Sequence, residues 1–307
     1  MRLPIVLALI ALGLNSTTRA EQVFQISWPT QHAAPPAKLA PEQQNLLPLI
    51  RLGIASVPEA NLMSLVMAAG TATGLDPEEA KLLQNHITRR YQTLAKDPTF
   101  AQLPSALPYC FSETRPTNGL ASIYVPPNIR EETPCILFLH SFGGSFSLYL
   151  HLMAETFPDH LIICPAYGIT SYNISSTYLK ECVAAASKKI GVSVSQPLLI
   201  GISAGGFGAF QEYANQHTSY RGLICMAAHP PAESLRSIPP QARIRLVVGQ
   251  NEFFVKENHF QRSVQFLEQR CSNFQTQLMS DEDHFFLLTS QTATQILLKR
   301  WDKEFAR

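Results

Sequence analysis

Charged residues are scarce in this chain. Asp, Glu, Lys and Arg make up 15% of its 307 residues, well below the usual quarter or so, and the formal net charge is +1. Neither a basic stripe nor an acidic run occurs. This scarcity argues against a nucleic-acid partner and against a polybasic membrane patch. Disorder is also excluded for most of the chain, because 46% of the residues are hydrophobic.

Long apolar runs are absent too, apart from a short one at the N-terminus. Arg2 precedes an apolar segment over residues 3–14, which is too short to cross a bilayer about 30 Å thick as a helix. Thr18-Arg19-Ala20 resembles a signal-peptidase site. We therefore expect residues 1–20 to be a signal peptide and the chain to be exported, either periplasmic or secreted, with no membrane span after cleavage. An uncleaved interfacial anchor is the alternative.

Metal-binding spacing is also missing. There is no CxxC pair and no Cys/His cluster, so no metal site is expected. Six cysteines are present, and an even number in an exported chain permits disulfides. However, Cys135, Cys164 and Cys225 lie in apolar strand-like runs, where free cysteine is a common small core residue. The sequence leaves the pairing open for Cys110, Cys135, Cys164, Cys182, Cys225 and Cys271.

The N-terminal third differs in pattern from the rest. Residues 21–48 are rich in proline and polar side chains and predict an irregular arm. Residues 57–70 and 77–96 predict helices. The second has the stronger signal, because Asp76 can cap it and Pro77 suits its first position. We expect residues 21–110 to form an arm and a helical extension.

Apolar strands then alternate with helices. This alternation predicts an α/β fold with a mostly parallel, doubly wound sheet covered on both faces. The expected strands are 119–128, 134–140, 161–168, 197–203, 222–228, 243–249 and 273–280. The expected helices are 146–157, 176–190, 206–217, 257–270 and 291–305.

A serine between glycines follows one of these strands, in the stretch PLLIGISAGGFGAF over residues 197–210. Gly201 to Gly205 fit G-x-S-x-G between a strand and a helix, which places Ser203 on a sharp turn above the sheet. A glycine turn that only packs helix on sheet, as in nucleotide-binding folds, is the alternative. The stretch lacks both G-x-G-x-x-G and a following lysine for phosphate.

A second glycine-containing loop, LHSFGGSF over residues 139–146, follows an earlier strand. With these two motifs, residues 119–305 resemble the α/β-hydrolase superfamily, its esterase-like members in particular. The resemblance implies an oxyanion hole made by the N–H groups of Phe142 and Ala204. It also implies that His140, Ser141 and Gly143 line the substrate site; Ser141 stands where the family often has glycine.

The resemblance further implies an acid and a histidine, in that order after the serine. Glu252 occupies the position of the acid in the family's G-x-x-D pattern, with Glu233 as a reserve. His284, followed by an aromatic residue, is the implied base. Any of Asp281, Glu282 and Asp283 could orient this histidine instead. His229 also follows a strand, and we expect it to line the substrate site.

These residues predict a serine hydrolase that cleaves carboxylic esters through an acyl-enzyme on Ser203. The expected substrate is a small-molecule or polymeric ester, and no cofactor or metal is required. Acyl transfer, peptide hydrolysis and a non-catalytic binding role remain alternatives. We expect the catalytic domain to cover residues 111–307, without a lid in the short segment 229–243. The N-terminal helices are expected to shape the acyl pocket, and the sequence does not indicate the oligomeric state.

Overall fold

An eight-stranded sheet runs through the molecule in the order β1-β2-β4-β3-β5-β6-β7-β8. The computed structural model describes residues 20–36, 38–39, 41–62, 77–170 and 174–306. β1 pairs antiparallel with β2, and β2 pairs antiparallel with β4, whereas all the other neighbours are parallel. The strands are β1 (Gln22–Pro29), β2 (Asn118–Val125), β3 (Cys135–Leu139), β4 (Leu161–Ala166), β5 (Leu198–Ile202), β6 (Gly222–Met226), β7 (Arg243–Gly249) and β8 (Asn273–Met279).

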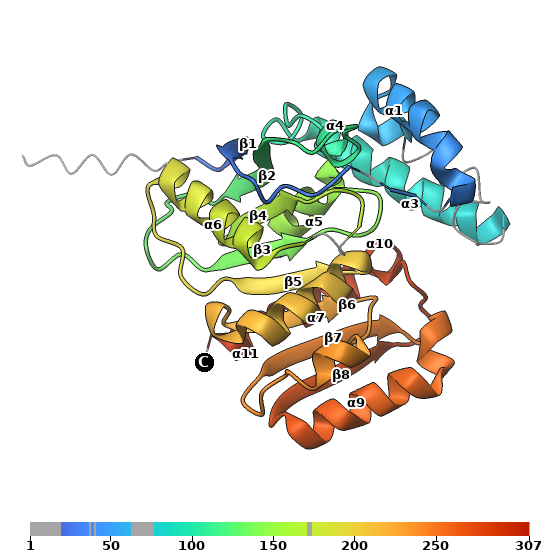
Figure 1. Ribbon diagram of the computed structural model, residues 1–307, viewed down its shortest axis with the longest axis vertical. Helices are drawn as coiled ribbons and strands as arrows, with labels where there is room; N and C mark the ends of the chain where they lie inside the picture. The colour runs from blue at the N-terminus through green and yellow to red at the C-terminus, as the bar shows by residue number, and fades with distance from the viewer. Residues whose placement is uncertain (1–19, 37, 40, 63–76, 171–173, 307) are drawn as a thin grey trace, which may run out of the picture.

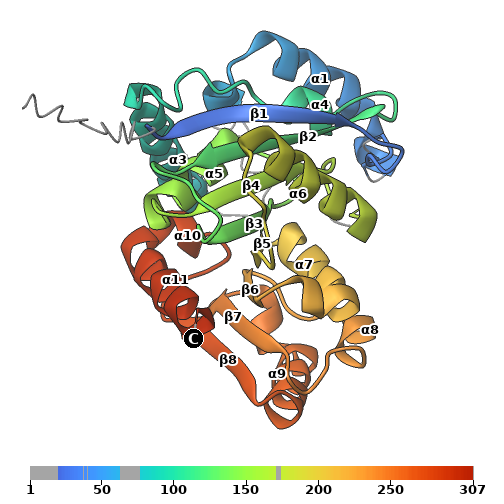
Figure 2. The same cartoon turned by 90° about the vertical axis from the view of Figure 1, so that its left-hand side faces the viewer.

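Helices cover both faces of this sheet (Figures 1 and 2). α6, α7 and α9 pack on one face, and α3, α5 and α11 pack on the other. The prediction of a mostly parallel, doubly wound α/β sheet is therefore confirmed. The helices are η1 (Pro41–Leu46), α1 (Leu47–Ser56), α3 (Pro77–Lys96), α4 (Leu107–Cys110), α5 (Ser147–Thr156), α6 (Ser176–Ile190), α7 (Ala204–Gln216), η3 (His217–Ser219), α8 (Ala232–Leu235), η4 (Phe253–Lys256), α9 (Asn258–Arg270), α10 (Phe286–Thr289) and α11 (Gln291–Phe305).

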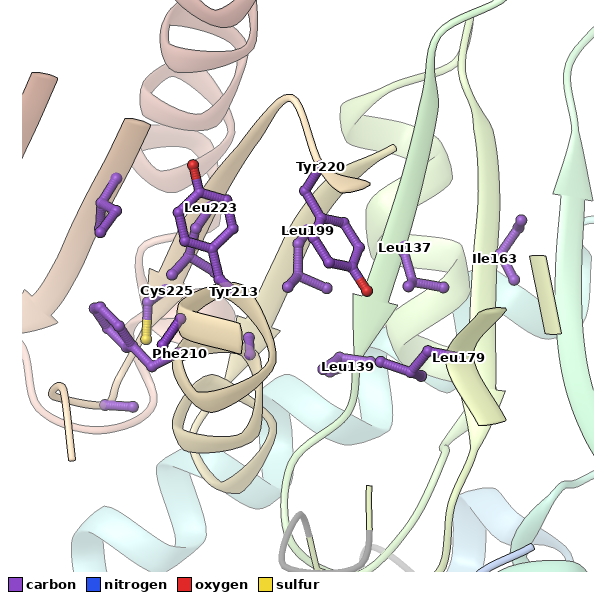
Figure 3. Packing of buried hydrophobic residues seen from close by; sticks show 14 of the residues in the cluster. Leu137, Leu139, Ile163, Leu179, Leu199, Phe210, Tyr213, Tyr220, Leu223 and Cys225 are labelled. Carbon is purple, nitrogen blue, oxygen red and sulfur yellow. The ribbon is translucent and has the colours of Figure 1, made fainter. Parts of the chain in front are cut away.

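The centre of the sheet is buried on both faces. Every residue of β3, β5 and β6 is buried, as their continuous apolar runs predict. Leu137, Leu199 and Leu223 lie side by side in register across these three strands, and Phe210 and Leu179 belong to the same buried cluster (Figure 3). The carboxyl ends of these strands are thus held on a rigid support, and the candidate site lies there.

The irregular arm expected over residues 21–48 is wrong for its first part, because Gln22–Pro29 form the edge strand β1. Ile26 and Trp28 point to the buried side, and the Trp28 ring lies over Gly119 of β2, where a Cβ atom would come within 2.2 Å of the ring. Pro29 ends the strand, as proline commonly does at a sheet edge. The expected domain boundary at residue 111 therefore cuts the sheet, since β1 lies on the other side of it.

The helix expected over residues 57–70 is helical from residue 59 as far as the structure describes it, and a separate helix precedes it. α1 spans Leu47–Ser56, and Val57 is extended and ends it. Residues 59–62 are helical again, and residues 63–70 lie outside the described part. The helix expected over 77–96 is confirmed as α3.

The connection from β6 to β7 contains a single helix, the four-residue α8, so this fully described segment holds no lid domain. Disulfides are not found: all six cysteines are free and buried. Burial raises the pKa of each of the six thiols. No helix in the described ranges has the length and apolar character needed to cross a membrane. The expected signal peptide lies almost entirely outside those ranges.

Candidate active site

Ser203 occupies a sharp turn between β5 and α7. Its backbone has φ 52° and ψ −122°, a conformation that side-chain-bearing residues rarely adopt. The turn requires glycine on both sides. A Cβ on Gly205 would lie 2.2 Å from the Leu139 carbonyl oxygen, and one on Gly201 would lie 2.3 Å from the Gly205 carbonyl oxygen. The Ser203 N–H donates to the Met226 carbonyl at 2.8 Å. The strained turn is therefore fixed by packing and by β6, and it lifts the serine above the sheet.

His284 lies on the loop after β8, and its ring reaches the serine. The Ser203 hydroxyl and His284 Nε2 are 2.8 Å apart, which is hydrogen-bond distance. The His284 side chain is 35% exposed. A base within this reach of a hydroxyl, with one edge open to solvent, can take the proton from the serine and pass it to a departing group.

Glu252 lies behind the histidine, at the end of β7. The protonated Nδ1 of His284 is 3.1 Å from both Glu252 carboxylate oxygens. The Glu252 side chain is fully buried, so its charge is shielded from water and directed at the ring. This contact fixes the tautomer in which Nε2 is free to accept the proton of Ser203.

The loops that carry Glu252 and His284 are packed directly on each other. A Cβ on Gly249 would lie 2.2 Å from the Asp283 carbonyl oxygen, so only glycine allows this approach. The Asn251 N–H donates to the Glu282 carbonyl at 2.8 Å. Backbone contacts therefore set the distance between the carboxylate and the imidazole.

The other acids considered for this role are engaged elsewhere. The Glu282 carboxylate accepts hydrogen bonds from the Thr289 and Ser290 hydroxyls. Asp283 accepts the Phe285 N–H at 2.8 Å. Asp281 is exposed, and so is Glu233 on α8. In the part of the chain that the structure describes, the carboxylate bonded to His284 is that of Glu252.

Two backbone N–H donors lie at the same end of the sheet, one in the loop after β3 and the other at the start of α7. Phe142 lies in this loop and is 55% exposed, and no acceptor for its N–H occurs among the described residues. Ala204 is the first residue of α7, and the N–H of a first helical residue has no acceptor within its own helix. Both N–H groups are thus free to bind a developing negative charge.

One of the expected substrate contacts, His140, is contradicted. His140 is 1% exposed, and its ring stacks on Tyr167 with centroids 3.8 Å apart. Its Nδ1–H donates to the Ser141 carbonyl at 2.8 Å, and burial lowers its pKa to about 4. His140 is therefore a neutral core residue, which cannot reach a substrate. The Gly143 N–H donates to the Ile169 carbonyl at 2.9 Å and is thus engaged, while the expected place of Gly143 in the lining of the substrate site stays a prediction.

The other two expected contacts lie nearer the surface. The Ser141 hydroxyl is 2.6 Å from the Tyr149 hydroxyl, so it is used to hold its own loop. His229 is half-buried between the rings of Phe207 and Phe254, each with its centroid 5.0 Å away. Its role as a substrate contact stays a prediction.

Sequence motifs did not indicate the residues that hold the loop of residues 140–146 from behind. The Tyr167 hydroxyl donates to the His140 carbonyl at 2.5 Å, and Cys110 lies against Gly144. No local pattern marks these residues, because each contact joins segments that are distant in the sequence. Among the described residues, no group of three or more His, Cys, Asp and Glu side chains is arranged to hold a metal ion.

Comparison with known proteins gives remote likenesses. No family model and no curated protein matches the chain. Among solved structures, a predicted CIB-like hydrolase from Thermoplasma acidophilum has a TM-score of 0.48 at 13% identity, over 62% of this chain and 94% of its own. Est1E from Butyrivibrio proteoclasticus has a TM-score of 0.45 at 13% identity, with 61% and 95% covered.

A thermostable esterase has a TM-score of 0.43 at 14% identity over 55% of this chain, and the chain spans 52% of that protein's length. Because these scores and identities are low, the fold is assigned from the strand order and connectivity of the chain itself.

Proposed function

We propose that this chain, which has the α/β-hydrolase fold, is a serine hydrolase that cleaves carboxylic esters. One observation carries the proposal: Ser203, on a strained turn, is joined to His284 and Glu252 by a continuous hydrogen-bonded chain, and the N–H groups of Phe142 and Ala204 are unused at the same end of the sheet. Such a chain activates a hydroxyl that is otherwise a poor nucleophile.

The first half of the reaction forms an acyl-enzyme. Ser203 Oγ attacks the ester carbonyl carbon while His284 Nε2 takes the hydroxyl proton. The N–H groups of Phe142 and Ala204 bind the oxyanion, each contributing about 3 kcal/mol to the transition state. The tetrahedral intermediate then collapses. The bond to the alkoxy oxygen breaks, and that oxygen takes the proton from Nε2 and leaves as the alcohol.

The second half releases the acid. Water attacks the acyl carbon of the ester on Ser203, and His284 takes the water's proton. The C–Oγ bond then breaks, and Oγ takes the proton back. Throughout, the buried Glu252 carboxylate stabilises the imidazolium and holds the ring in place. Esters are the favoured substrate class because their alkoxy leaving groups make them the least demanding substrates for such a triad.

Labelling with a fluorophosphonate tests the proposal without assuming a substrate. We expect one adduct per folded chain, mapped by peptide mass to Ser203, and loss of that adduct in Ser203→Ala and His284→Ala. The half-buried His217, next to the far end of α7, offers a matched control, and His217→Ala should label as the native chain does. Hydrolysis of p-nitrophenyl esters should follow the same pattern.

Each alternative gives a different result. A folded native protein that takes no label and cleaves no ester would contradict the proposal and indicate a binding protein on a hydrolase fold. Labelling without ester cleavage, but with cleavage of peptides, would identify a peptidase. A product ratio dominated by transfer to an added alcohol would identify an acyltransferase.

A further inference from the structure

Glu59, from the N-terminal extension, lies at the centre of a hydrogen-bond cluster behind the loop of residues 140–146. Its carboxylate accepts four hydrogen bonds. The Tyr91 hydroxyl of α3 donates to it at 2.7 Å, and the Ser105 hydroxyl donates at 2.5 Å. The N–H and the hydroxyl of Ser147 each donate at 2.7 Å. One half-buried carboxylate therefore joins three segments that the sequence separates widely.

The contact with Ser147 is made at the start of α5. Ser147 is the first residue of this helix, and the residue before it makes no side-chain cap. The first N–H groups of a helix have no acceptor within it and carry partial positive charge. The Glu59 carboxylate therefore acts as a cap supplied from a distant part of the chain. Because Phe146 directly precedes Ser147, this cap also fixes the end of the loop that contains Phe142.

A second support reaches the same loop through α4. A Cβ on Gly144 would lie 2.9 Å from the Leu107 side chain and 3.2 Å from that of Cys110, so α4 lies directly against the loop. The backbone N–H groups of Ser145 and Gly168 lie near the Cys110 thiol and partly offset the rise in its pKa that burial causes. Ser105, which donates to Glu59, accepts the Leu107 N–H at 3.3 Å. Glu59 thus bonds directly to Ser147 at the start of α5 and reaches α4 indirectly, through Ser105.

We propose that Glu59 is a positioning residue for the oxyanion hole, holding the Phe142 N–H in place through the start of α5 and through Ser105 at α4. The inference rests on the proposed function, since it assigns the oxyanion to that N–H. It gives the N-terminal extension a role in the rate of the reaction. A donor displaced by even a fraction of an ångström stabilises the transition state less, while the binding of the uncharged ester is little affected.

Glu59→Gln tests the proposal, because the amide keeps the shape and removes the charge and one acceptor. We expect kcat to fall about tenfold, less than the 10²-fold or more lost with a whole donor, and KM to stay within twofold. The matched control is Glu113→Gln, just after the N-terminal extension. Glu113 is an exposed carboxylate whose partner is Arg51, so its replacement should leave kcat and KM unchanged. Active sites are counted by fluorophosphonate titration, so that the rates refer to folded enzyme.

A loss of stability alone would leave one quantity unchanged. This quantity is the rate on an ester divided by the rate on the matching thionoester. Sulfur is a poor hydrogen-bond acceptor, so this ratio measures how well the oxyanion hole is formed. We expect Glu59→Gln to lower the ratio several-fold and Glu113→Gln to leave it unchanged. If Glu59→Gln does not fold, Ser147→Ala removes one of the four hydrogen bonds and should lower the ratio in the same direction.

An unchanged ratio in folded Glu59→Gln would overturn the positioning role; where only Ser147→Ala folds, an unchanged ratio in that variant would do the same. The proposed function would remain intact, provided that the native chain is active and Ser203→Ala is not. A native chain without hydrolysis and without labelling would overturn both. A fall in the ratio for Glu113→Gln equal to that for Glu59→Gln would also overturn the inference, because the effect would then not depend on contact with α5.

Discussion

Glu252 is the residue on which the assignment of the triad depends most, because glutamate stands where aspartate is more usual. Its carboxylate is fully buried and 3.1 Å from Nδ1 of His284. Without the negative charge, the ring would lose its fixed tautomer and the imidazolium its stabilisation.

We expect Glu252→Gln to lower kcat/KM for ester hydrolysis by about 10³-fold or more while the fold is retained. Steady-state kinetics on a p-nitrophenyl ester would measure the change, and far-ultraviolet circular dichroism would check the fold. Asp281→Asn is the matched control, because Asp281 is an exposed acid on the loop of His284. A larger effect from Asp281 than from Glu252 would reassign the acid of the triad.

His140 makes the stability of the fold depend on pH. Burial lowers its pKa to about 4, against 6.5 for an ordinary histidine. Between these values the unfolded chain binds the proton and the folded chain does not, so stability falls as the pH falls. The contribution of the neutral His140 to the free energy of unfolding is fully present above pH 6.5. About 3 kcal/mol of that contribution is lost by pH 4, at 1.36 kcal/mol per pKa unit.

Urea unfolding at pH 7 and at pH 4 would measure this loss, with His140→Gln as the comparison. The variant lacks the titrating ring, so its free energy of unfolding should change less between the two pH values, by up to about 3 kcal/mol. Equal pH dependence in the two proteins would show that other groups account for acid sensitivity.

At the scale of elements, local signals predicted what local contacts stabilise. α3 and α6 begin and end where expected, because proline at the first position of α3 and Gly191 in the left-handed conformation after α6 are signals within one turn of the boundary. β1 was missed because its partner is far away: Gln25 pairs with Ser122, 97 residues along the chain. The prolines from Pro29 onward also made the segment look irregular, although apolar and polar residues alternate just before them.

The candidate site shows the same division. Ser203, Glu252 and His284 follow strands in recognisable patterns, so their positions could be predicted. The supports of the loop of residues 140–146 could not, since Glu59 and Cys110 reach it only through tertiary packing. The interior position of His140 was also missed, because a histidine after a buried strand has the same pattern whether it faces the core or a ligand.

Trp28 allows a test of whether β1 is an integral part of the sheet. Its ring is 7% exposed and covers Gly119. Trp28→Ala should lower the free energy of unfolding by about 3–5 kcal/mol, the usual cost of truncating a large buried ring. Urea unfolding followed by tryptophan-independent circular dichroism would measure it. Ser27→Ala, on the exposed side of the same strand, should change little; equal small losses would indicate a loosely attached strand.

For the molecule as a whole, the start of β1 at Gln22 bears on the hypothesis of export. Cleavage after Ala20 would leave β1 intact, whereas cleavage a few residues later would remove sheet hydrogen bonds. We expect N-terminal sequencing of the protein recovered from an exporting host to begin at or next to Glu21. A chain that begins at Met1 in the membrane fraction would instead support an uncleaved anchor.

Because all six thiols are buried, their rates of modification report local opening of the structure. Each sulfur lies inside the packed interior, and burial disfavours the reactive thiolate. A thiol reagent in solution therefore modifies a cysteine only when the surrounding structure opens, much as solvent deuterium reaches a protected amide. The six modification rates would map the opening free energy across the molecule: at Cys110 behind the loop of residues 140–146, at Cys135, Cys164 and Cys225 in the sheet, and at Cys182 and Cys271 on and beside its helices.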